Sequence, residues 1–194
     1  ENDIQFIIEN ENRLVDAIQN LHDIHQVPYR IVHNDTKLNN ILLDKDTNEA
    51  ICVIDLDTVM IGSLLYDFGD MVRSACSTAV EDERDLNLVT IDLTKFEKLV
   101  EGYLSSNIYN SKMSNESLIL SNIELDYLSL SGQIVTYEQG IRFLNDFLLG
   151  DVYYSTNPNR EGKHNLERSR NQLKLLSEMK RNEREMSEIV NRFR

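Results

Sequence analysis

Apolar positions follow two kinds of spacing along the chain, helical at the start and in the second half, and β-like in between. Isoleucines and leucines recur at mostly helical intervals over residues 4–25, and Pro28 ends the pattern, which predicts one long amphipathic helix. Short runs rich in β-branched side chains follow at residues 29–32, 40–43 and 50–54. A polar turn separates the last two runs, so we expect a small β-hairpin beside a loop.

The second half of the chain predicts helices. Apolar side chains at helical spacing occupy residues 65–75, 96–104, 125–148 and 165–179. The second of these helices is expected to begin near residues 92–94. Ser121 and Glu124 have the spacing of a capping box before the third helix, and Gly150 is placed to end it. Residues 180–194 carry many charges and are expected to fray. The predicted fold is mainly α with a small β-hairpin, an α+β class.

Charge and composition exclude several classes of protein. The chain has 33 acidic and 20 basic residues, a formal net charge of −13, which disfavours binding to nucleic-acid phosphates or anionic lipids. No apolar run approaches the ~20 residues of a membrane helix, and the first residues do not form a signal peptide. Cys52 and Cys76 lie in apolar sequence without a second thiol nearby, which predicts buried free thiols. We therefore expect a cytoplasmic protein without nucleic-acid or membrane partners.

The most informative stretch carries the pattern H-x-D-x-x-x-x-N, in which His33, Asp35 and Asn40 are the fixed positions, and the strand after the hairpin ends at Asp55. Phosphoryl transfer from ATP needs a carboxylate that accepts the proton of the attacking hydroxyl, and oxygen ligands that hold Mg²⁺ against the triphosphate. We predict that Asp35 is the base and that Asn40 and Asp55 are metal ligands. His33 is expected to support the loop through a hydrogen bond. A purely structural role for Asp35, Asn40 and Asp55 would not explain their joint spacing.

This arrangement resembles the catalytic loop of the protein-kinase-like fold. Asp55 is followed by Leu56-Asp57 instead of Phe-Gly, and no Ala-Pro-Glu follows, so protein kinases fit poorly. Further motifs are H-N-D-T-K-L-N-N, I-D-L-D-T, L-Y-D-F-G-D, Q-G-I-R-F-L, G-D-V-Y-Y and H-N-L, which begin at residues 33, 54, 65, 139, 150 and 164. With these motifs the chain resembles the aminoglycoside phosphotransferase and choline kinase superfamily, and within it the N-acetylhexosamine 1-kinases. The resemblance runs over residues 27–176.

The resemblance implies roles for further side chains. Lys37 would steady the transferred phosphoryl group, as the matching lysine does in Ser/Thr kinases. Arg142 and Tyr153 match the arginine and tyrosine that contact the sugar, although an arginine on a helix is by default a solvated charge. Asp57 is either a second metal carboxylate or a turn residue. Asp67 either lines the sugar site or is an acidic residue favoured in the first turn of a helix.

The resemblance also implies that residues 1–194 are the C-terminal lobe of a kinase-like phosphotransferase, with Mg²⁺ and ATP as cofactors. An N-terminal lobe with a phosphate-covering loop is expected to be missing, because 32 residues precede His33 and the first glycine is Gly62. We expect the isolated lobe to fold but to be inactive. It is expected to expose an apolar patch where the missing lobe would pack, through which it self-associates.

The function implied by the resemblance is the transfer of phosphate from ATP to the anomeric hydroxyl of an N-acetylhexosamine. A kinase for an aminoglycoside, choline-like or other amino-alcohol acceptor is the alternative, since an acidic surface would suit a cationic acceptor. A non-catalytic module that keeps the kinase fold for protein binding is a third hypothesis. The presence of the base and both metal ligands argues against that module.

Overall fold

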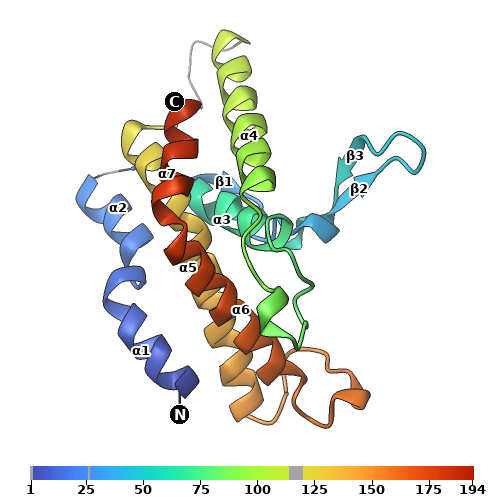
Figure 1. Cartoon of the computed structure of the whole chain (residues 1–194). Helices are drawn as coiled ribbons and strands as arrows, with labels where there is room; N and C mark the ends of the chain where they lie inside the picture. The colour runs from blue at the N-terminus through green and yellow to red at the C-terminus, as the bar shows by residue number, and fades with distance from the viewer. Residues whose placement is uncertain (1, 26, 114–119) are drawn as a thin grey trace.

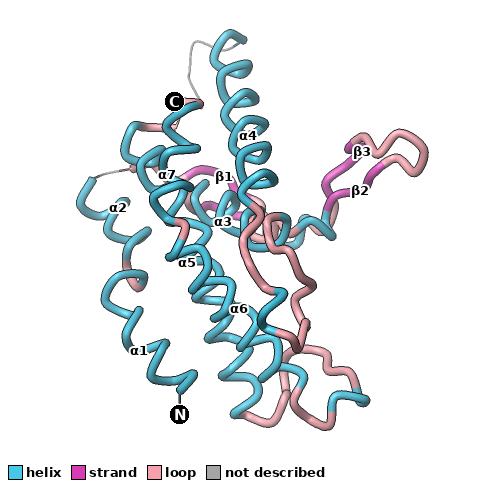
Figure 2. The backbone as a smooth tube through the Cα atoms, viewed as in Figure 1, coloured by secondary structure: helices cyan, strands magenta, loops and turns pink. Residues whose placement is uncertain are grey.

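The computed structural model describes residues 2–25, 27–113 and 120–194. Its helices and strands, in chain order, are α1 (Asn2–Leu14), α2 (Ala17–His25), β1 (Arg30–Val32), β2 (Ile41–Leu43), β3 (Ala50–Val53), β4 (Met60–Gly62), α3 (Leu64–Ala75), α4 (Leu93–Met113), α5 (Asn122–Leu148), α6 (His164–Arg181) and α7 (Glu183–Arg192). Figure 1 shows the helices gathered into one body from which the β2–β3 hairpin projects. The predicted mainly α fold with a small β component is therefore confirmed, as the colours of Figure 2 make plain. Within the described ranges, no helix has both the length and the apolar character needed to cross a membrane.

The first predicted helix is in fact two. Helices α1 and α2 are separated at Asp16, whose φ of 63° lies in the left-handed region that an α-helix does not use. Leu14, Ile18 and Leu21 are buried on either side of the break, so the apolar pattern was read correctly but the continuity of the helix was not. An aspartate tolerates this conformation better than most residues because its short side chain bonds locally.

The strands form two separate antiparallel pairs. The predicted hairpin is confirmed, with β2 paired to β3. Strand β1 pairs with β4, a three-residue strand that the sequence pattern did not predict, and Ile31 lies opposite Ile61. Cys52 on β3 is exposed, so its predicted burial is wrong: the hairpin projects from the helical body and does not pack into it. Cys76, at the end of α3, is buried and free, as predicted.

Helix α5 is the central helix and packs along both α3 and α6. Phe68 on α3, Leu128 on α5 and Met179 on α6 are fully buried in the core between them. The backbones of α3 and α5 come so close at Gly69 that a Cβ there would lie 2.5 Å from the carbonyl oxygen of Ser131. This contact fixes the distance between α3 and α5.

Both ends of α5 were predicted from the sequence. The Ser121 side chain accepts a hydrogen bond from the Glu124 N–H, and the Glu124 carboxylate accepts one from the Ser121 N–H, which is the predicted capping box. Glu124 is fully buried and also accepts hydrogen bonds from Arg30, at 2.5 and 3.2 Å, so the same carboxylate joins α5 to β1. At the other end, Gly150 has a φ of 93° and follows the last turn.

The starts of the other two long helices also match expectation. Helix α4 begins at Leu93, and Asp92 accepts hydrogen bonds from the backbone N–H groups of Thr94 and Lys95. Helix α6 begins at His164, one residue before the expected start.

The predicted fraying of residues 180–194 is wrong. After a short break at Asn182, α7 continues to Arg192 and packs against α4 and α5. Met186, Ile189 and Val190 are buried, which gives this charged helix an apolar face that anchors it to the core.

Candidate active site

The loop after β1 is held by hydrogen bonds from two directions. On one side, the backbone N–H groups of His33 and Asn34 donate to the two carboxylate oxygens of Asp67, at 2.8 and 2.7 Å. On the other side, His33 Nε2 lies 3.0 Å from the carbonyl oxygen of Ile54, and the Thr58 hydroxyl donates to the His33 carbonyl at 2.6 Å. The loop is thus fixed between the first turn of α3 and the segment that follows β3. The contacts of His33 are those that a supporting role requires.

The Asp35 side chain lies at the centre of this loop and is partly buried. Its Oδ2 atom accepts hydrogen bonds from Lys37 Nζ at 2.6 Å and from Asn40 Nδ2 at 2.9 Å. Asn40 Nδ2 also donates to the Asp35 carbonyl at 2.8 Å. Within the described chain, no hydrogen bond engages Asp35 Oδ1. One carboxylate oxygen is therefore held in place while the other is left for a ligand.

The surroundings of Asp35 keep its carboxyl group ionised. Burial acts to raise its pKa, but it is outweighed by the hydrogen bonds from Lys37 and Asn40 and by the positive charges of Lys37 and Arg73. The net effect is a pKa below the ordinary value of 3.8. A carboxylate that stays ionised at neutral pH is ready to accept a hydrogen bond, and then a proton, from an attacking hydroxyl.

Asn40 and Asp55 are brought together by the hairpin, as predicted from their positions. The Ile54 N–H donates to the Asn40 carbonyl at 2.9 Å, so Asp55 follows directly after the residue bonded to Asn40. Asp55 has a φ of 63°, an unusual conformation for a residue other than glycine and one that recurs at functional sites. The amide nitrogen of buried Asn40 is used by Asp35, and no described residue bonds its Oδ1.

The side-chain oxygens of Asn40 and Asp55 suit a hard cation such as Mg²⁺, which takes most of its ligands from phosphate and water. No group of three or more His, Cys, Asp or Glu side chains in the described chain is arranged to hold a metal, so Asp35, Asp55 and Asp57 do not form an all-protein cage. Asp57 is exposed in the short 3₁₀ turn after Asp55. Asn40 would therefore bind Mg²⁺ through its side-chain amide oxygen and Asp55 through its carboxylate. Asp57 remains a predicted ligand.

The predicted sugar contacts lie in a second group, around Tyr154. The guanidinium carbon of Arg142, on α5, is 5.8 Å from the centroid of the Tyr154 ring. The Tyr153 ring lies 4.8 Å from that of Tyr154, and the Tyr153 side chain is 74% exposed. The structure thus brings Arg142 and Tyr153 to one place. No contact in the described chain joins either of them to Asp35.

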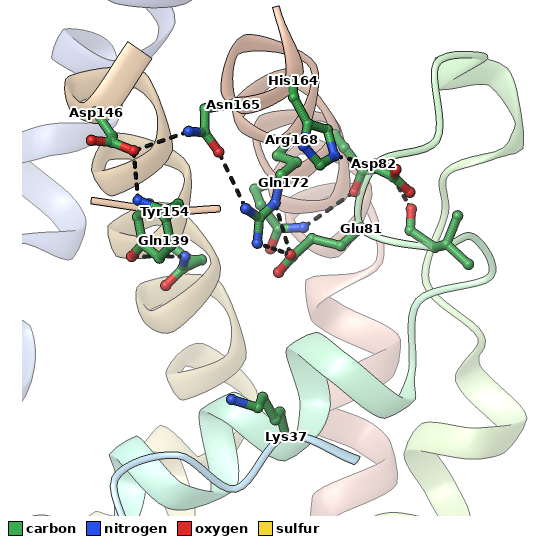
Figure 3. A network of polar contacts seen from close by, with 12 residues as sticks. Lys37, Glu81, Asp82, Gln139, Asp146, Tyr154, His164, Asn165, Arg168 and Gln172 are labelled. Atoms are coloured by element: carbon green, nitrogen blue, oxygen red, sulfur yellow. Dashed lines mark hydrogen bonds and ion pairs between the residues drawn. The ribbon is translucent and has the colours of Figure 1, made fainter. Parts of the chain in front are cut away.

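Asp146 organises the loop that carries these tyrosines, and the sequence analysis did not find it. Its Oδ1 accepts hydrogen bonds from the N–H groups of Val152 and Tyr153, and its Oδ2 from those of Tyr154 and the Asn165 side chain, all at 2.8–3.0 Å. Figure 3 shows Asp146 and Asn165 side by side above Tyr154. The sequence does contain one signal for the role of Asp146. Its carboxylate lies in the last turn of a predicted helix, where the helix dipole disfavours negative charge unless hydrogen-bond donors surround it.

A second group of charges found in the structure lies between α3 and α6. Glu81 accepts hydrogen bonds from Arg73 Nη1 at 2.8 Å and from Arg168 at 2.5 and 3.0 Å. Arg73 also donates to Asp70 at 2.8 Å and is buried. The guanidinium of Arg168 lies 3.8 Å from the centroid of the Phe143 ring, which connects this group to the end of α5. In Figure 3, Lys37 stands apart from the dashed contacts that join Glu81 to its neighbours.

Comparison with known families bears on the first half of the chain. Residues 5–90 match the model of the phosphotransferase enzyme family, APH. This match supports the assignment of the chain to the kinase-like phosphotransferase superfamily. The matched region contains the predicted base and metal ligands, Asp35, Asn40 and Asp55, and enzymes of this family typically use ATP with Mg²⁺. It ends before Arg142 and Tyr153, so the sugar contacts and the resemblance to N-acetylhexosamine 1-kinases stay predictions.

Proposed function

We propose that this chain is the C-terminal lobe of a Mg²⁺- and ATP-dependent phosphotransferase that phosphorylates a sugar hydroxyl, with the anomeric hydroxyl of an N-acetylhexosamine as the acceptor. The observation that carries the proposal is the state of Asp35: one oxygen is fixed by Lys37 and Asn40, and the other is open. Asn40, one of the two predicted metal ligands, donates to Asp35, and its carbonyl accepts a hydrogen bond from the N–H of Ile54, the residue before Asp55. The family match over residues 5–90 supports the same class of reaction.

The residues divide the work of phosphoryl transfer. Asp35 accepts a hydrogen bond from the acceptor hydroxyl, which orients it, and takes its proton as the oxygen attacks the terminal phosphate. Lys37, already beside Asp35, offers its remaining N–H groups to the transferring phosphoryl oxygens. A Mg²⁺ ion, when bound by Asn40 and Asp55, would neutralise charge on the phosphates. Arg142 and Tyr153 would hold the sugar.

An N-terminal lobe is part of this proposal because the strand region presents apolar side chains to solvent. Ile31, Leu42, Ile51, Met60 and Ile61 are each close to half exposed or more. Large apolar side chains exposed together on neighbouring strands are typical of an interaction site, and Ile31 and Ile61 are cross-strand partners. In the kinase-like arrangement that surface would face the nucleotide and the lobe that covers its phosphates.

A cationic acceptor is the second candidate, and the observation that favours it is the net charge of −13. The deciding experiment is an ADP-release assay on the protein that carries both lobes, with N-acetylglucosamine, N-acetylgalactosamine, choline and kanamycin as acceptors. We expect turnover with the two N-acetylhexosamines. Preference for choline or kanamycin would replace the acceptor in the proposal, and ADP release with none of the four would contradict the sugar-kinase proposal.

Arg142→Ala tests the sugar contact in the same assay. The KM for the sugar should rise more than the KM for ATP, because the arginine lies on α5 beside Tyr154, the neighbour of the predicted sugar contact Tyr153, and has no contact with the predicted nucleotide ligands in the described chain. The matched control is Arg184→Ala, an exposed arginine on α7 that is paired with Glu188. Equal effects of the two substitutions would remove Arg142 from the site.

A further inference from the structure

The two segments that carry the predicted base and a predicted metal ligand meet where the β1–β4 strand pair ends. Strand β1 leads into the loop of Asp35, and the short turn that begins at Asp55 leads into β4. The antiparallel register of the pair, continued two residues beyond its last partners, places Asn34 opposite Thr58. Side-chain hydrogen bonds take the place of the backbone ladder at this position.

Thr58 bonds the loop of Asp35 through two of its groups. Its hydroxyl donates to the His33 carbonyl at 2.6 Å, and its carbonyl accepts a hydrogen bond from Asn34 Nδ2 at 3.3 Å. The first bond is short for a hydroxyl donor and Thr58 is partly buried, whereas the second is long and Asn34 is exposed. We refer to these two hydrogen bonds as the Thr58 latch, in which the hydroxyl bond is the stronger one.

The latch is the second of two connections between the same segments. At the other end of the turn, His33 Nε2 lies 3.0 Å from the Ile54 carbonyl, and the Ile54 N–H donates to the Asn40 carbonyl at 2.9 Å. Asp55 thus lies in a turn, residues 54–58, whose two ends are both bonded to the loop that carries the predicted base. A rotation of the turn about one end would have to break the hydrogen bonds at the other end.

The backbone of both segments needs such support. Asn34 and Asp55 have φ angles of 61° and 63°, in the left-handed region that residues other than glycine seldom adopt. Strained conformations of this kind persist only where the surrounding contacts hold them. If Asp55 relaxed to an ordinary conformation, its carboxylate would change direction. The hydrogen bonds of Ile54 and Thr58 on either side of Asp55 oppose that change.

We propose that Thr58 is a positioning residue for phosphoryl transfer, whose hydrogen bonds set the distance between Asp35 and Asp55. The inference rests on the proposed phosphotransferase function, which gives those two carboxylates their roles. Transfer requires the acceptor hydroxyl, oriented by the base, to meet the terminal phosphate, oriented through the cation. A displacement of about 1 Å between such groups can cost about 10²-fold in rate. Thr58 acts through this geometry and does not itself touch the reactants.

The test is the effect of the Thr58 hydroxyl on kcat and on both KM values of the two-lobed protein. Thr58→Val keeps the β-branched shape and should lower kcat about tenfold or more, with KM values for ATP and acceptor within about twofold, because the reactants bind but meet in a poorer geometry. Thr58→Ser keeps a hydroxyl and should restore kcat to within about twofold.

Thr78→Val is the matched control. The Thr78 hydroxyl donates to the Leu88 carbonyl at 2.7 Å, so the control loses a similar hydrogen bond between two other loop segments. Its kcat should stay within about twofold of the unaltered value. Equal falls in kcat for Thr58→Val and Thr78→Val, or a fall in Thr58→Val that Thr58→Ser shares, would overturn the proposal.

Asn34→Gly tests the weaker bond of the latch without adding strain. Glycine adopts the left-handed conformation readily, so this variant keeps the backbone and loses the side-chain amide. We expect kcat to fall about threefold, less than in Thr58→Val, because the lost bond is long and exposed. Asn48→Gly, in the hairpin turn at a φ of 58°, is the control and should leave kcat unchanged. A larger fall in Asn34→Gly than in Thr58→Val would contradict the leading role of the hydroxyl.

Hydrogen exchange of the 194-residue chain separates this inference from the proposed function. Thr58→Val should speed exchange of the Ile54 N–H about fivefold or more relative to core amides of α5, and Thr78→Val should not. Faster exchange at Ile54 without phosphorylation by the unaltered two-lobed protein would keep the link between the segments but contradict the phosphotransferase. Phosphorylation with an unchanged kcat in Thr58→Val would support the phosphotransferase and overturn this inference.

Discussion

The two carboxylate oxygens of Asp35 differ in their hydrogen bonds. Lys37 and Asn40 both donate to Oδ2, and in the proposed mechanism the unbonded Oδ1 receives the acceptor hydroxyl. Asn40 is similar, because its side-chain nitrogen donates to Asp35, and the proposed mechanism uses its side-chain oxygen as a metal ligand. The two residues therefore connect the predicted base to the predicted metal site through one amide, so a substitution at Asn40 would disturb both.

The pKa of Asp35 provides a direct test of this environment. Lys37→Gln removes both a hydrogen bond and a positive charge, so the pKa of Asp35 should rise from below 3.8 toward that value or above it. Because the folded-state pKa is depressed, the stability that this group contributes is present above the unfolded-state pKa and is lost as pH falls through the folded-state pKa. In Lys37→Gln the folded-state pKa approaches the unfolded-state value, so this contribution to stability should be smaller and its loss should be complete at a higher pH.

Carbon NMR of the Asp35 carboxyl group during an acid titration measures the shift. Lys45→Gln in the hairpin turn is the control, because it removes a lysine that makes no contact with Asp35. An Asp35 pKa that is the same in Lys37→Gln as in the unaltered chain would show that Lys37 does not set the charge state of the base.

Sequence spacing could predict contacts between site residues that lie close together along the chain. Asp35 and Asn40 share a loop, and a hairpin with an evident turn brings Ile54, the residue before Asp55, to the backbone of Asn40, so this proximity could be predicted from spacing. Asp67 was left open between two roles, and its contacts favour the structural one, since both oxygens accept loop N–H groups. Such pairing across 33 residues depends on where α3 packs, which no local pattern specifies.

At the scale of elements, the sequence predicted the positions of the helices well and the break between α1 and α2 poorly. Apolar spacing and caps placed α3, α4 and α5, because these signals are local. The break at Asp16 depends on one residue adopting a left-handed conformation, and the order in α7 depends on contacts with α4 and α5. Strand β4 is too short for an alternation pattern and exists because β1 lies beside it.

Two helical glycines offer a matched test of the packing of α3 on α5. Gly69→Ala should destabilise the fold by about 1–3 kcal/mol, because the new Cβ would lie 2.5 Å from the Ser131 carbonyl oxygen and the helices would have to separate. Gly102→Ala in α4 meets no atom within 4 Å and should stabilise the fold by about 0.5–1 kcal/mol through helix propensity. Urea unfolding of both variants gives the two values. Equal and small effects would mean that α3 and α5 do not approach this closely.

At the scale of the whole molecule, the helices bury a common core while the strand region exposes apolar side chains. Ile31 on β1 and Ile61 on β4 are cross-strand partners and are 76% and 75% exposed. Asn40 and Asp55, the proposed metal ligands, lie at the ends of strands β2 and β3 in the same region, so in the proposal the second lobe covers a surface close to the reacting groups. The sequence analysis anticipated an exposed patch, but its composition depended on the unpredicted strand β4.

Replacing both isoleucines tests the role of this surface. The double variant Ile31→Thr and Ile61→Thr keeps β-branched side chains and removes apolar area, so self-association of the chain should weaken while the free energy of unfolding changes by less than about 0.5 kcal/mol. Sedimentation equilibrium measures the association, and Ile24→Thr, 69% exposed at the end of α2, is the control. Self-association that is unchanged in the double variant, or equally weakened in the control, would show that the strand surface is not where copies meet.

The central claim is that Asp35 is the base of a phosphotransferase, and one rate measurement tests it most directly. In the two-lobed protein, with saturating Mg²⁺-ATP and the best acceptor from the panel, Asp35→Asn should lower single-turnover phosphoryl transfer by about 10²–10⁴-fold, the usual contribution of a positioned base. Nucleotide affinity should be retained, since Asn40 and Asp55 are intact, and Asp44→Asn in the exposed hairpin turn should transfer phosphate at the original rate. A transfer rate for Asp35→Asn within tenfold of the unaltered enzyme would contradict the account.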